Sequence, residues 1–75
     1  IQIYPNPARS QVNIELFGYS NAQYMLFNTM GQLILNQRIH KSTKLDISTI
    51  PSGMYYLRVA DDINSITKSL IISKQ

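Results

Sequence analysis

The sequence predicts an all-β fold, a compact immunoglobulin-like antiparallel β-sandwich of about seven short strands. Apolar and polar residues alternate with a period of two through most of the chain, which is the pattern of strands with one buried face. Turn-forming residues interrupt the alternation every ~8–12 positions, a spacing typical of sandwiches and barrels. The chain has no cysteine and no tryptophan, so the immunoglobulin likeness concerns the architecture alone.

The alternation divides the chain into strands and turns that fill it from end to end. The predicted strands are residues 1–4, 11–16, 22–27, 33–39, 44–48, 54–59 and 65–73. The predicted turns are residues 17–21, 28–31, 40–42, 49–53 and 61–64. A chain of 75 residues has room for one domain and little room for a deep catalytic cleft.

The first four strands are predicted from local features. The first ends at Pro5, because proline has no backbone N–H to donate to a neighbouring strand. In the second, Val12, Ile14 and Leu16 alternate with polar residues, which predicts a half-buried strand. The third is apolar on both faces, as expected for a strand at the centre of a sheet or covered by a loop. Gly31 supplies the positive φ of a hairpin turn before the fourth.

The last three strands differ in how clearly they alternate. The fifth leads into a turn that ends at Gly53. The sixth alternates most clearly, with Tyr55 on the face predicted to be core and with Tyr56 and Arg58 on the opposite face. The seventh has residues 70–72 as its apolar centre, and we expect it to close the core, to lie at a sheet edge, or to do both.

Charge and hydropathy disfavour two classes of partner. The net charge is +3, but the seven Lys and Arg residues are scattered, whereas nucleic-acid-binding proteins concentrate their bases on one face. No stretch approaches the ~18 apolar residues of a membrane span, and no segment of these 75 residues has the pattern of a signal peptide. Because the chain begins with Ile1, already within a predicted strand, we expect it to be excised from a longer protein.

The residue types that perform catalysis or bind metals are sparse. His40 is the single histidine and lies in a predicted polar turn. Of the four acids, Asp61 and Asp62 alone are adjacent, and their spacing to Asn64 lacks the frame of an EF-hand calcium loop. Without cysteine, zinc sites are disfavoured. The sequence therefore predicts no enzyme, no metal site and no cofactor.

Four segments stand out together, in order along the chain. They are YPNPA at residues 4–8, NTMGQ at 28–32, LDISTIPSGMY at 45–55 and KSLII at 68–72. In this order and at this spacing they resemble the type A C-terminal sorting domain of the type IX secretion system, also called the Por secretion system C-terminal sorting domain. The resemblance covers nearly the whole chain.

The resemblance implies a function that the residues alone do not reveal. Residues 1–75 would be a single sorting domain at the C-terminus of a longer secreted protein. It would direct that protein from the periplasm across the outer membrane, to the cell surface or the medium. Its partners would be the outer-membrane translocon, shuttle proteins and a sortase-like surface protease that cleaves upstream of Ile1, after which the cargo is attached or released.

Several residues of the motifs are candidates for recognition, each with a structural alternative. Residues 5–7 either terminate a strand, with the asparagine bonding local backbone, or contact the translocon. For the two motif glycines, Gly31 and Gly53, the structural alternative is a place in a turn. The last strand, if it lies at a sheet edge, offers backbone groups to which a partner can add a strand. The candidates are Pro5, Asn6, Pro7, Gly31, Gly53, Tyr55, Tyr56, Arg58, Lys68, Leu70, Ile71 and Ile72.

Two other functions remain open at this point. A generic adhesive or carbohydrate-binding β-sandwich of a surface protein would need an aromatic platform, for which Tyr4, Tyr19 and Tyr56 are the candidates. A nucleic-acid-binding β-barrel is disfavoured by the scattered bases. We expect neither nucleic acid nor a small-molecule substrate as a partner, and edge strands would allow the isolated domain to dimerise.

Overall fold

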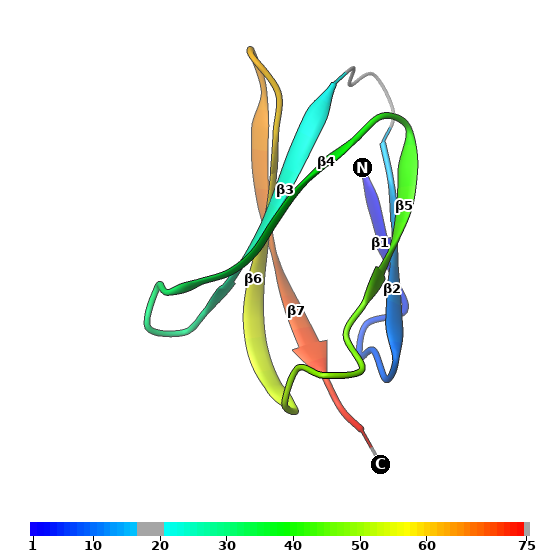
Figure 1. The fold of residues 1–75 in the computed structure, drawn as a ribbon, viewed down its shortest axis with the longest axis vertical. Helices are drawn as coiled ribbons and strands as arrows, with labels where there is room; N and C mark the ends of the chain where they lie inside the picture. Colours follow the sequence, from blue (N-terminus) through cyan, green and yellow to red (C-terminus); the bar gives the residue numbers. More distant parts are fainter. Residues whose placement is uncertain (17–20, 75) are drawn as a thin grey trace.

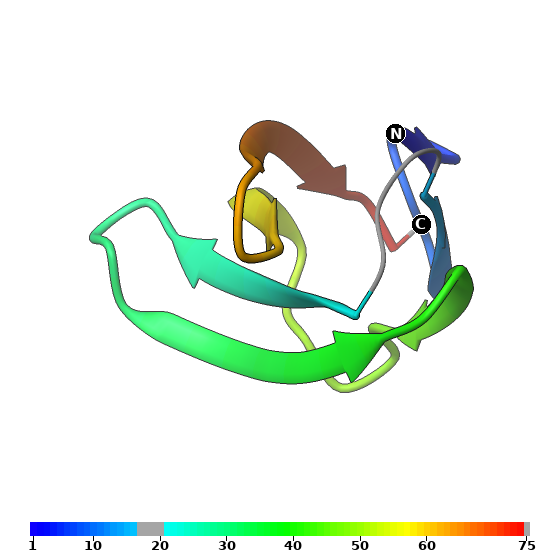
Figure 2. The same ribbon diagram turned by 90° about the horizontal axis from the view of Figure 1, so that it is seen from above.

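Two antiparallel sheets pack face to face in a computed structural model that describes residues 1–16 and 21–74. The three-stranded sheet has the order β1 (Gln2–Tyr4), β2 (Gln11–Glu15) and β5 (Ser42–Asp46). The four-stranded sheet has the order β4 (Leu33–Ile39), β3 (Ala22–Asn28), β6 (Gly53–Ala60) and β7 (Ser65–Ile72). These seven strands are the secondary structure of the described residues, and the predicted all-β sandwich is confirmed (Figures 1 and 2).

The core lies between the two sheets and is built from alternate residues of the strands. The small sheet contributes Val12 and Ile14, and the large sheet contributes Leu26, Leu57 and Leu70, all fully buried. No polar or charged residue is buried within the part of the chain that the structure describes. Because period-two alternation places every second side chain on one face, the predicted core faces of the second and sixth strands are confirmed.

Two turns behave as the sequence predicts, and a third falls outside the described residues. Gly31 has φ +84° in the β3–β4 hairpin, and the β6–β7 turn spans residues 61–64. Of the turn predicted at residues 17–21, the structure describes Asn21 alone, with φ +54°. β3 lies in the middle of its sheet, as its two apolar faces predicted.

The last strand both closes the core and lies at an edge of its sheet, as the two compatible alternatives allowed. Leu70 and Ile72 are buried, but Ile71 is 46% exposed on the outer face of the large sheet. Consecutive residues of a strand point to opposite faces, so three apolar residues in a row cannot all reach the core. The fifth strand lies two residues earlier than the predicted residues 44–48, since it runs from Ser42 to Asp46.

Candidate functional site

The first motif pairs with the outer edge of the last strand. β7 is an edge strand of the large sheet, and Ile71 directs its backbone groups away from β6. The Oδ1 atom of Asn6 accepts a hydrogen bond from the N–H of Ile71 at 3.0 Å. The Nδ2 group of Asn6 donates to the carbonyl of Ser69 at 3.1 Å. The side-chain amide therefore takes the place of a peptide unit of a neighbouring strand.

The backbone of Ala8 continues this pairing toward the end of β7. Its N–H donates to the carbonyl of Ile71 at 2.8 Å, and its carbonyl accepts from the N–H of Ser73 at 2.8 Å. Ala8 is fully buried. Pro5 and Pro7 follow cis peptide bonds and have no N–H to donate, so the pairing depends on Asn6 and Ala8. We call these five residues the clasp: Asn6, Ala8, Ser69, Ile71 and Ser73.

The third motif is fixed beside the clasp by contacts from the C-terminal end of the chain. The Nζ of Lys74 donates to the carbonyl of Ser48 at 2.6 Å, and its backbone N–H donates to Oγ of Ser52 at 3.1 Å. The hydroxyl of Tyr55 donates to the carbonyl of Pro51 at 2.7 Å. The first, third and fourth motifs therefore meet at one end of the sandwich, which is the lower end in Figure 1.

The second motif lies elsewhere and closes the β3–β4 hairpin. Oδ1 of Asn28 accepts hydrogen bonds from the N–H groups of Met30 at 2.9 Å and Gln32 at 3.0 Å. The Nδ2 group of Asn28 donates to Oε1 of Gln32 at 2.8 Å. This hairpin extends away from the small sheet (Figures 1 and 2). Its motif residues stabilise a turn and take no part in the clasp.

The structure divides the predicted recognition residues into buried and exposed groups. Tyr55, Leu70 and Ile72 belong to the core, so the structural alternative holds for them. Gly31 has φ +84° in its turn, as expected of a turn glycine, whereas Gly53, predicted as the end of a turn, is the first residue of β6, with φ +155°. The exposed candidates are Pro5, Asn6, Pro7, Tyr56, Arg58, Lys68 and Ile71.

One structural expectation for the first motif is wrong, and several residues were missed. Asn6 does not bond local backbone; its partners lie 63 and 65 positions away along the chain. Ala8, Ser52 and Lys74 were not among the candidates, although Ala8 pairs with the end of the chain and Lys74 joins that end to Ser52 in the β5–β6 loop. Ala8 and Ser52 lie within the quoted motifs, whereas Lys74 carries no local signal because its partners are in the β5–β6 loop.

The edge of β7 is open along half of its length. The clasp covers the edge at residues 69–73, which leaves the edge at residues 65–67 for strand addition. Lys68 pairs in register with the buried Leu57, so its side chain lies on the core-facing side of an edge strand. An inward-pointing charge of this kind disfavours pairing with another sheet.

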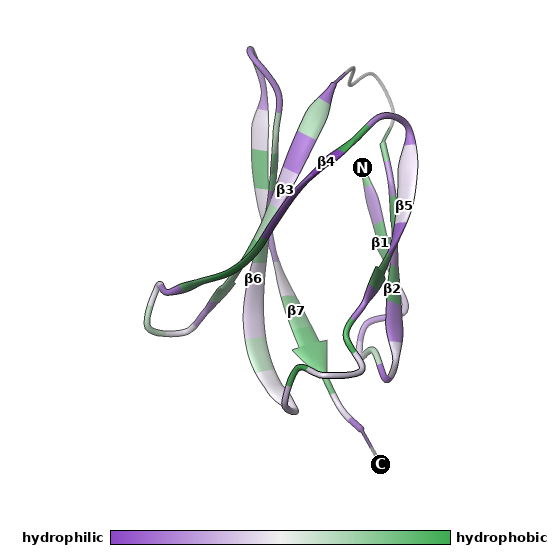
Figure 3. Ribbon diagram, viewed as in Figure 1, coloured by the Kyte–Doolittle hydropathy of each residue, from purple (hydrophilic) through white to green (hydrophobic). Residues whose placement is uncertain are grey.

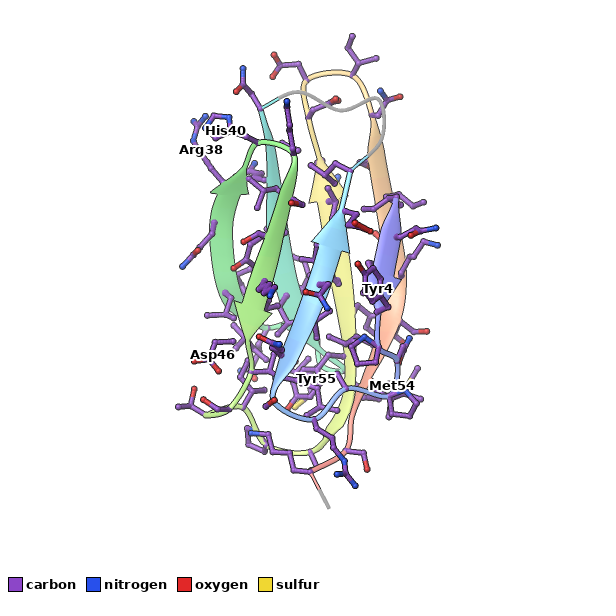
Figure 4. All side chains as sticks on the ribbon, turned by 90° about the vertical axis from the view of Figure 1, so that its right-hand side faces the viewer. Tyr4, Arg38, His40, Asp46, Met54 and Tyr55 are labelled. Atoms are coloured by element: carbon purple, nitrogen blue, oxygen red, sulfur yellow. The ribbon has the colours of Figure 1, made fainter. Side chains whose placement is uncertain are left out.

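The aromatic platform that a carbohydrate-binding module needs is not formed by Tyr4 and Tyr56, the two candidate tyrosines among the described residues. Tyr4 lies on β1 of the small sheet, and its hydroxyl donates to Oε1 of Glu15 at 3.0 Å (Figure 4). Tyr56 lies on β6 of the large sheet. Tyr19 lies outside the described residues. The carbohydrate-binding alternative therefore has no support from this pair.

The titratable groups of the described residues have mainly structural roles. Hydrogen bonds from Ser48 lower the pKa of the Asp46 carboxyl, and the positive charge of Lys74 lowers it further. Backbone N–H groups of Asn64 and Ile63 lower the pKa of Asp61, whose Oδ1 accepts from both. No group of three or more His, Cys, Asp or Glu residues within residues 1–16 and 21–74 is placed to hold a metal ion.

These two carboxylates predict a loss of stability in acid. A carboxyl whose pKa is lowered on folding stabilises the folded state at pH values above its ordinary pKa of 3.8. This contribution to stability is lost as the pH falls through the lower pKa that the carboxyl has in the folded state. We expect the melting temperature of the unsubstituted domain to decrease as the pH is lowered below about 4. The decrease should be smaller in the double variant Asp46→Asn and Asp61→Asn. Asp62→Asn, in the same turn as Asp61, is the matched control, and an equal effect there would contradict the assignment.

The comparison with known families decides what this arrangement belongs to. A family model described as secretion system C-terminal sorting domain matches residues 2–73. The chain belongs to this family. It is also 28% identical over 74 residues to the ulvan lyase NLR42 of Nonlabens ulvanivorans. That match covers 96% of this chain and 14% of the lyase, so the chain spans a small part of the length of that relative.

Membership of the family defines the role of the domain. It is a C-terminal sorting signal of the type IX secretion system, and it marks the protein that carries it for export to the cell surface or the medium. A sorting signal acts through contact with the secretion machinery and is not a catalytic domain. The four motifs quoted from the sequence are thus those of a targeting module. Among the described residues, no helix is long and apolar enough to span a membrane.

Proposed function

We propose that this chain is the C-terminal domain of a longer secreted protein and is recognised, in folded form, by the outer-membrane translocon and its shuttle proteins in the periplasm. A sortase-like surface protease then cleaves upstream of Ile1, and the cargo is attached to the surface or released. The domain itself performs no chemistry and binds neither nucleic acid nor a small-molecule substrate.

The observation that carries this proposal is the clasp. Asn6 and Ala8, near the beginning of the chain, pair with residues 69–73 near its end. Because these contacts are separated by more than 60 residues in sequence, they exist only when the domain is folded. A receptor that contacts both ends therefore distinguishes a folded cargo tail from an unfolded one. Pro5, Pro7 and Lys68 are among the exposed motif residues near the two ends that such a receptor could contact.

The dispersed titratable residues support a role without catalysis. His40 is exposed in the β4–β5 turn (Figure 4). Glu15 accepts a hydrogen bond from Tyr4, and the carboxylates of Asp46 and Asp61 each accept hydrogen bonds from nearby backbone N–H groups. A general acid or base must instead reach a substrate proton within a site.

The test is a fusion of the complete domain to a periplasmic reporter in a bacterium that has this secretion system. We expect the full-length fusion to leave the cell and a fusion lacking residues 68–75 to stay in the periplasm. The deletion removes the buried Leu70 and Ile72 together with the clasp partners of Asn6. Equal export of the two fusions would overturn the proposal.

A second pair of fusions separates recognition from folding. The double variant Pro5→Ala and Pro7→Ala retains Asn6 and Ala8 and removes two exposed rings. If this variant folds, as judged by its melting temperature, and export falls, the motif contacts the machinery directly. Unchanged export would assign the two prolines a local structural role.

Self-association of the isolated domain would use β4 rather than β7. Asn6, Ala8 and Lys68 protect β7, whereas β4 is the other edge of the large sheet. β4 exposes Leu33 and Ile34 at 53% and 37%, in the hydrophobic segment beside the hairpin (Figure 3). Long apolar edge strands are the ones that pair between copies.

A further inference from the structure

The two outer faces of the sandwich differ in chemistry. The outer positions of the small sheet are polar, with Asn13, Glu15 and Lys44 among them. The outer positions of the large sheet carry a group of large apolar side chains that we call the outer patch: Met25, Phe27, Leu33, Met54, Tyr56 and Ile71. Large contiguous apolar patches on the surface of a protein are typical of interaction sites.

Strand register places the members of the outer patch side by side. Phe27 lies opposite Leu33 on one side and Tyr56 on the other, and Met54 lies opposite Ile71. Directly opposed residues of an antiparallel pair have Cβ atoms about 5 Å apart, so these side chains form one continuous surface across four strands. Met54, Tyr56 and Ile71 are 46%, 39% and 46% exposed.

A hollow of about 390 Å³ adjoins the outer patch. Phe27, Tyr56 and Arg58 line it together with Thr67 and the hairpin residues 28, 29 and 31. At Gly31 an added Cβ would meet nothing within 4 Å, so this side of the hollow is open. The hollow is large enough to admit a large side chain, and two aromatic rings and a guanidinium group line it.

The charge at this face is positive and has no acid beside it on the sheet. Arg58 lies opposite Met25 on one side and Thr67 on the other. None of the four acids of the chain occupies an outer position of the large sheet: Glu15 and Asp46 belong to the small sheet, and Asp61 and Asp62 lie in the β6–β7 turn. Those two aspartates share a separate small hollow with Arg38.

We propose that the outer patch and Arg58 form the docking surface for a protein of the secretion machinery that presents an apolar or aromatic side chain next to a carboxylate; this rests on the function proposed above. The apolar side chain fills the hollow between Phe27 and Tyr56. The carboxylate accepts two hydrogen bonds from the Arg58 guanidinium, in the bidentate geometry that arginine and carboxylate share. Aromatic residues, methionine and arginine are also the residue types enriched at protein interfaces.

The same features disfavour other occupants. In a symmetric dimer the face would meet itself, and Arg58 would be desolvated without a carboxylate from either copy. Nucleic acid and anionic lipid bind through clusters of bases, whereas this patch holds Arg58 among apolar side chains. A protein that supplies both the apolar group and the negative charge satisfies the whole surface.

The test compares charge reversals on the two outer faces, using the full-length reporter fusion. We expect Arg58→Glu to lower export at least ten-fold and Lys44→Glu, the same charge change on the small sheet, to alter it less than two-fold. Tyr56→Ser, which removes a wall of the hollow without changing charge, should lower export about five-fold. Melting temperatures establish that each variant is folded.

The outcomes separate this inference from the proposed function. If the unsubstituted fusion is not exported, the proposed function fails. If it is exported and folded Arg58→Glu and Tyr56→Ser variants are exported equally well, the docking surface is wrong while the function stands. Suppressors of Arg58→Glu that replace a carboxylate by lysine in a secretion protein would support the proposal. The purified domain could instead dimerise or bind phosphatidylglycerol vesicles. If it does either and Arg58→Glu abolishes that behaviour, the proposed docking of a secretion protein is overturned.

Discussion

Replacing Leu70 with alanine is expected to lower the free energy of unfolding by about 2–5 kcal/mol, because removal of a buried leucine side chain loses its burial and leaves a cavity. Leu70 is fully buried on β7, opposite Tyr55 of β6. Small domains have total stabilities of about 5–15 kcal/mol. The substitution therefore removes a large share of the stability, and urea denaturation at neutral pH measures it directly.

Ile71→Ala is the matched control, one residue further along the same strand. The Ile71 side chain is 46% exposed on the outer face, so its truncation should cost less than about 1 kcal/mol. A larger loss for Ile71 than for Leu70 would mean that the strand is shifted by one residue, because such a shift exchanges the faces of every side chain.

Much of the fold was predictable because alternation is a local property. Tyr55 and Leu57 were assigned to the core from the residues around them, and both are buried. The hairpin at Gly31 was predictable for the same reason, since its φ of +84° is a requirement of the turn itself. Each of these features depends on a few consecutive residues.

The features that were missed depend on the pairing between strands. Residues 70–72 are three apolar residues in succession, so no local pattern reveals that Ile71 points outward; its pairing with Met54 decides this. Lys68 follows the same rule, since its register with Leu57 turns its charge toward the core side. Sequence patterns define which residues alternate, and long-range pairing defines which strand lies at an edge.

The motifs of the family also have a physical explanation that the resemblance did not supply. Asn28 and Gln32 close a hairpin, and Asn6 and Ala8 cover a strand edge. In each case an asparagine amide satisfies backbone groups that would otherwise lack a partner, which is why the motifs contain asparagine and not an apolar residue. The folded domain brings the first, third and fourth motifs together at one end, although they are far apart in sequence, and leaves the second in the β3–β4 hairpin.

Replacing Asn6 with alanine is expected to lower the free energy of unfolding by about 1–3 kcal/mol, since it removes two hydrogen bonds worth about 0.5–1.5 kcal/mol each. The two bonds join Asn6 to the N–H of Ile71 and to the carbonyl of Ser69. The amide proton of Ile71 should then exchange with solvent faster. That of Leu70, which points to β6 because neighbouring residues alternate in direction, should exchange at a rate that reflects only the global loss of stability.

Asn36→Ala provides the comparison, because Asn36 is an exposed asparagine on β4 whose side chain forms no hydrogen bond with the described residues. It should leave both the stability and the exchange at Ile71 near those of the unsubstituted chain. If the two variants behave alike, the amide of Asn6 contributes no more than any exposed asparagine, and the edge of β7 is held by Ala8 alone. If exchange at Ile71 rises only in Asn6→Ala, a side chain near the beginning of the chain protects a backbone group near its end, which is the physical link between the two terminal motifs.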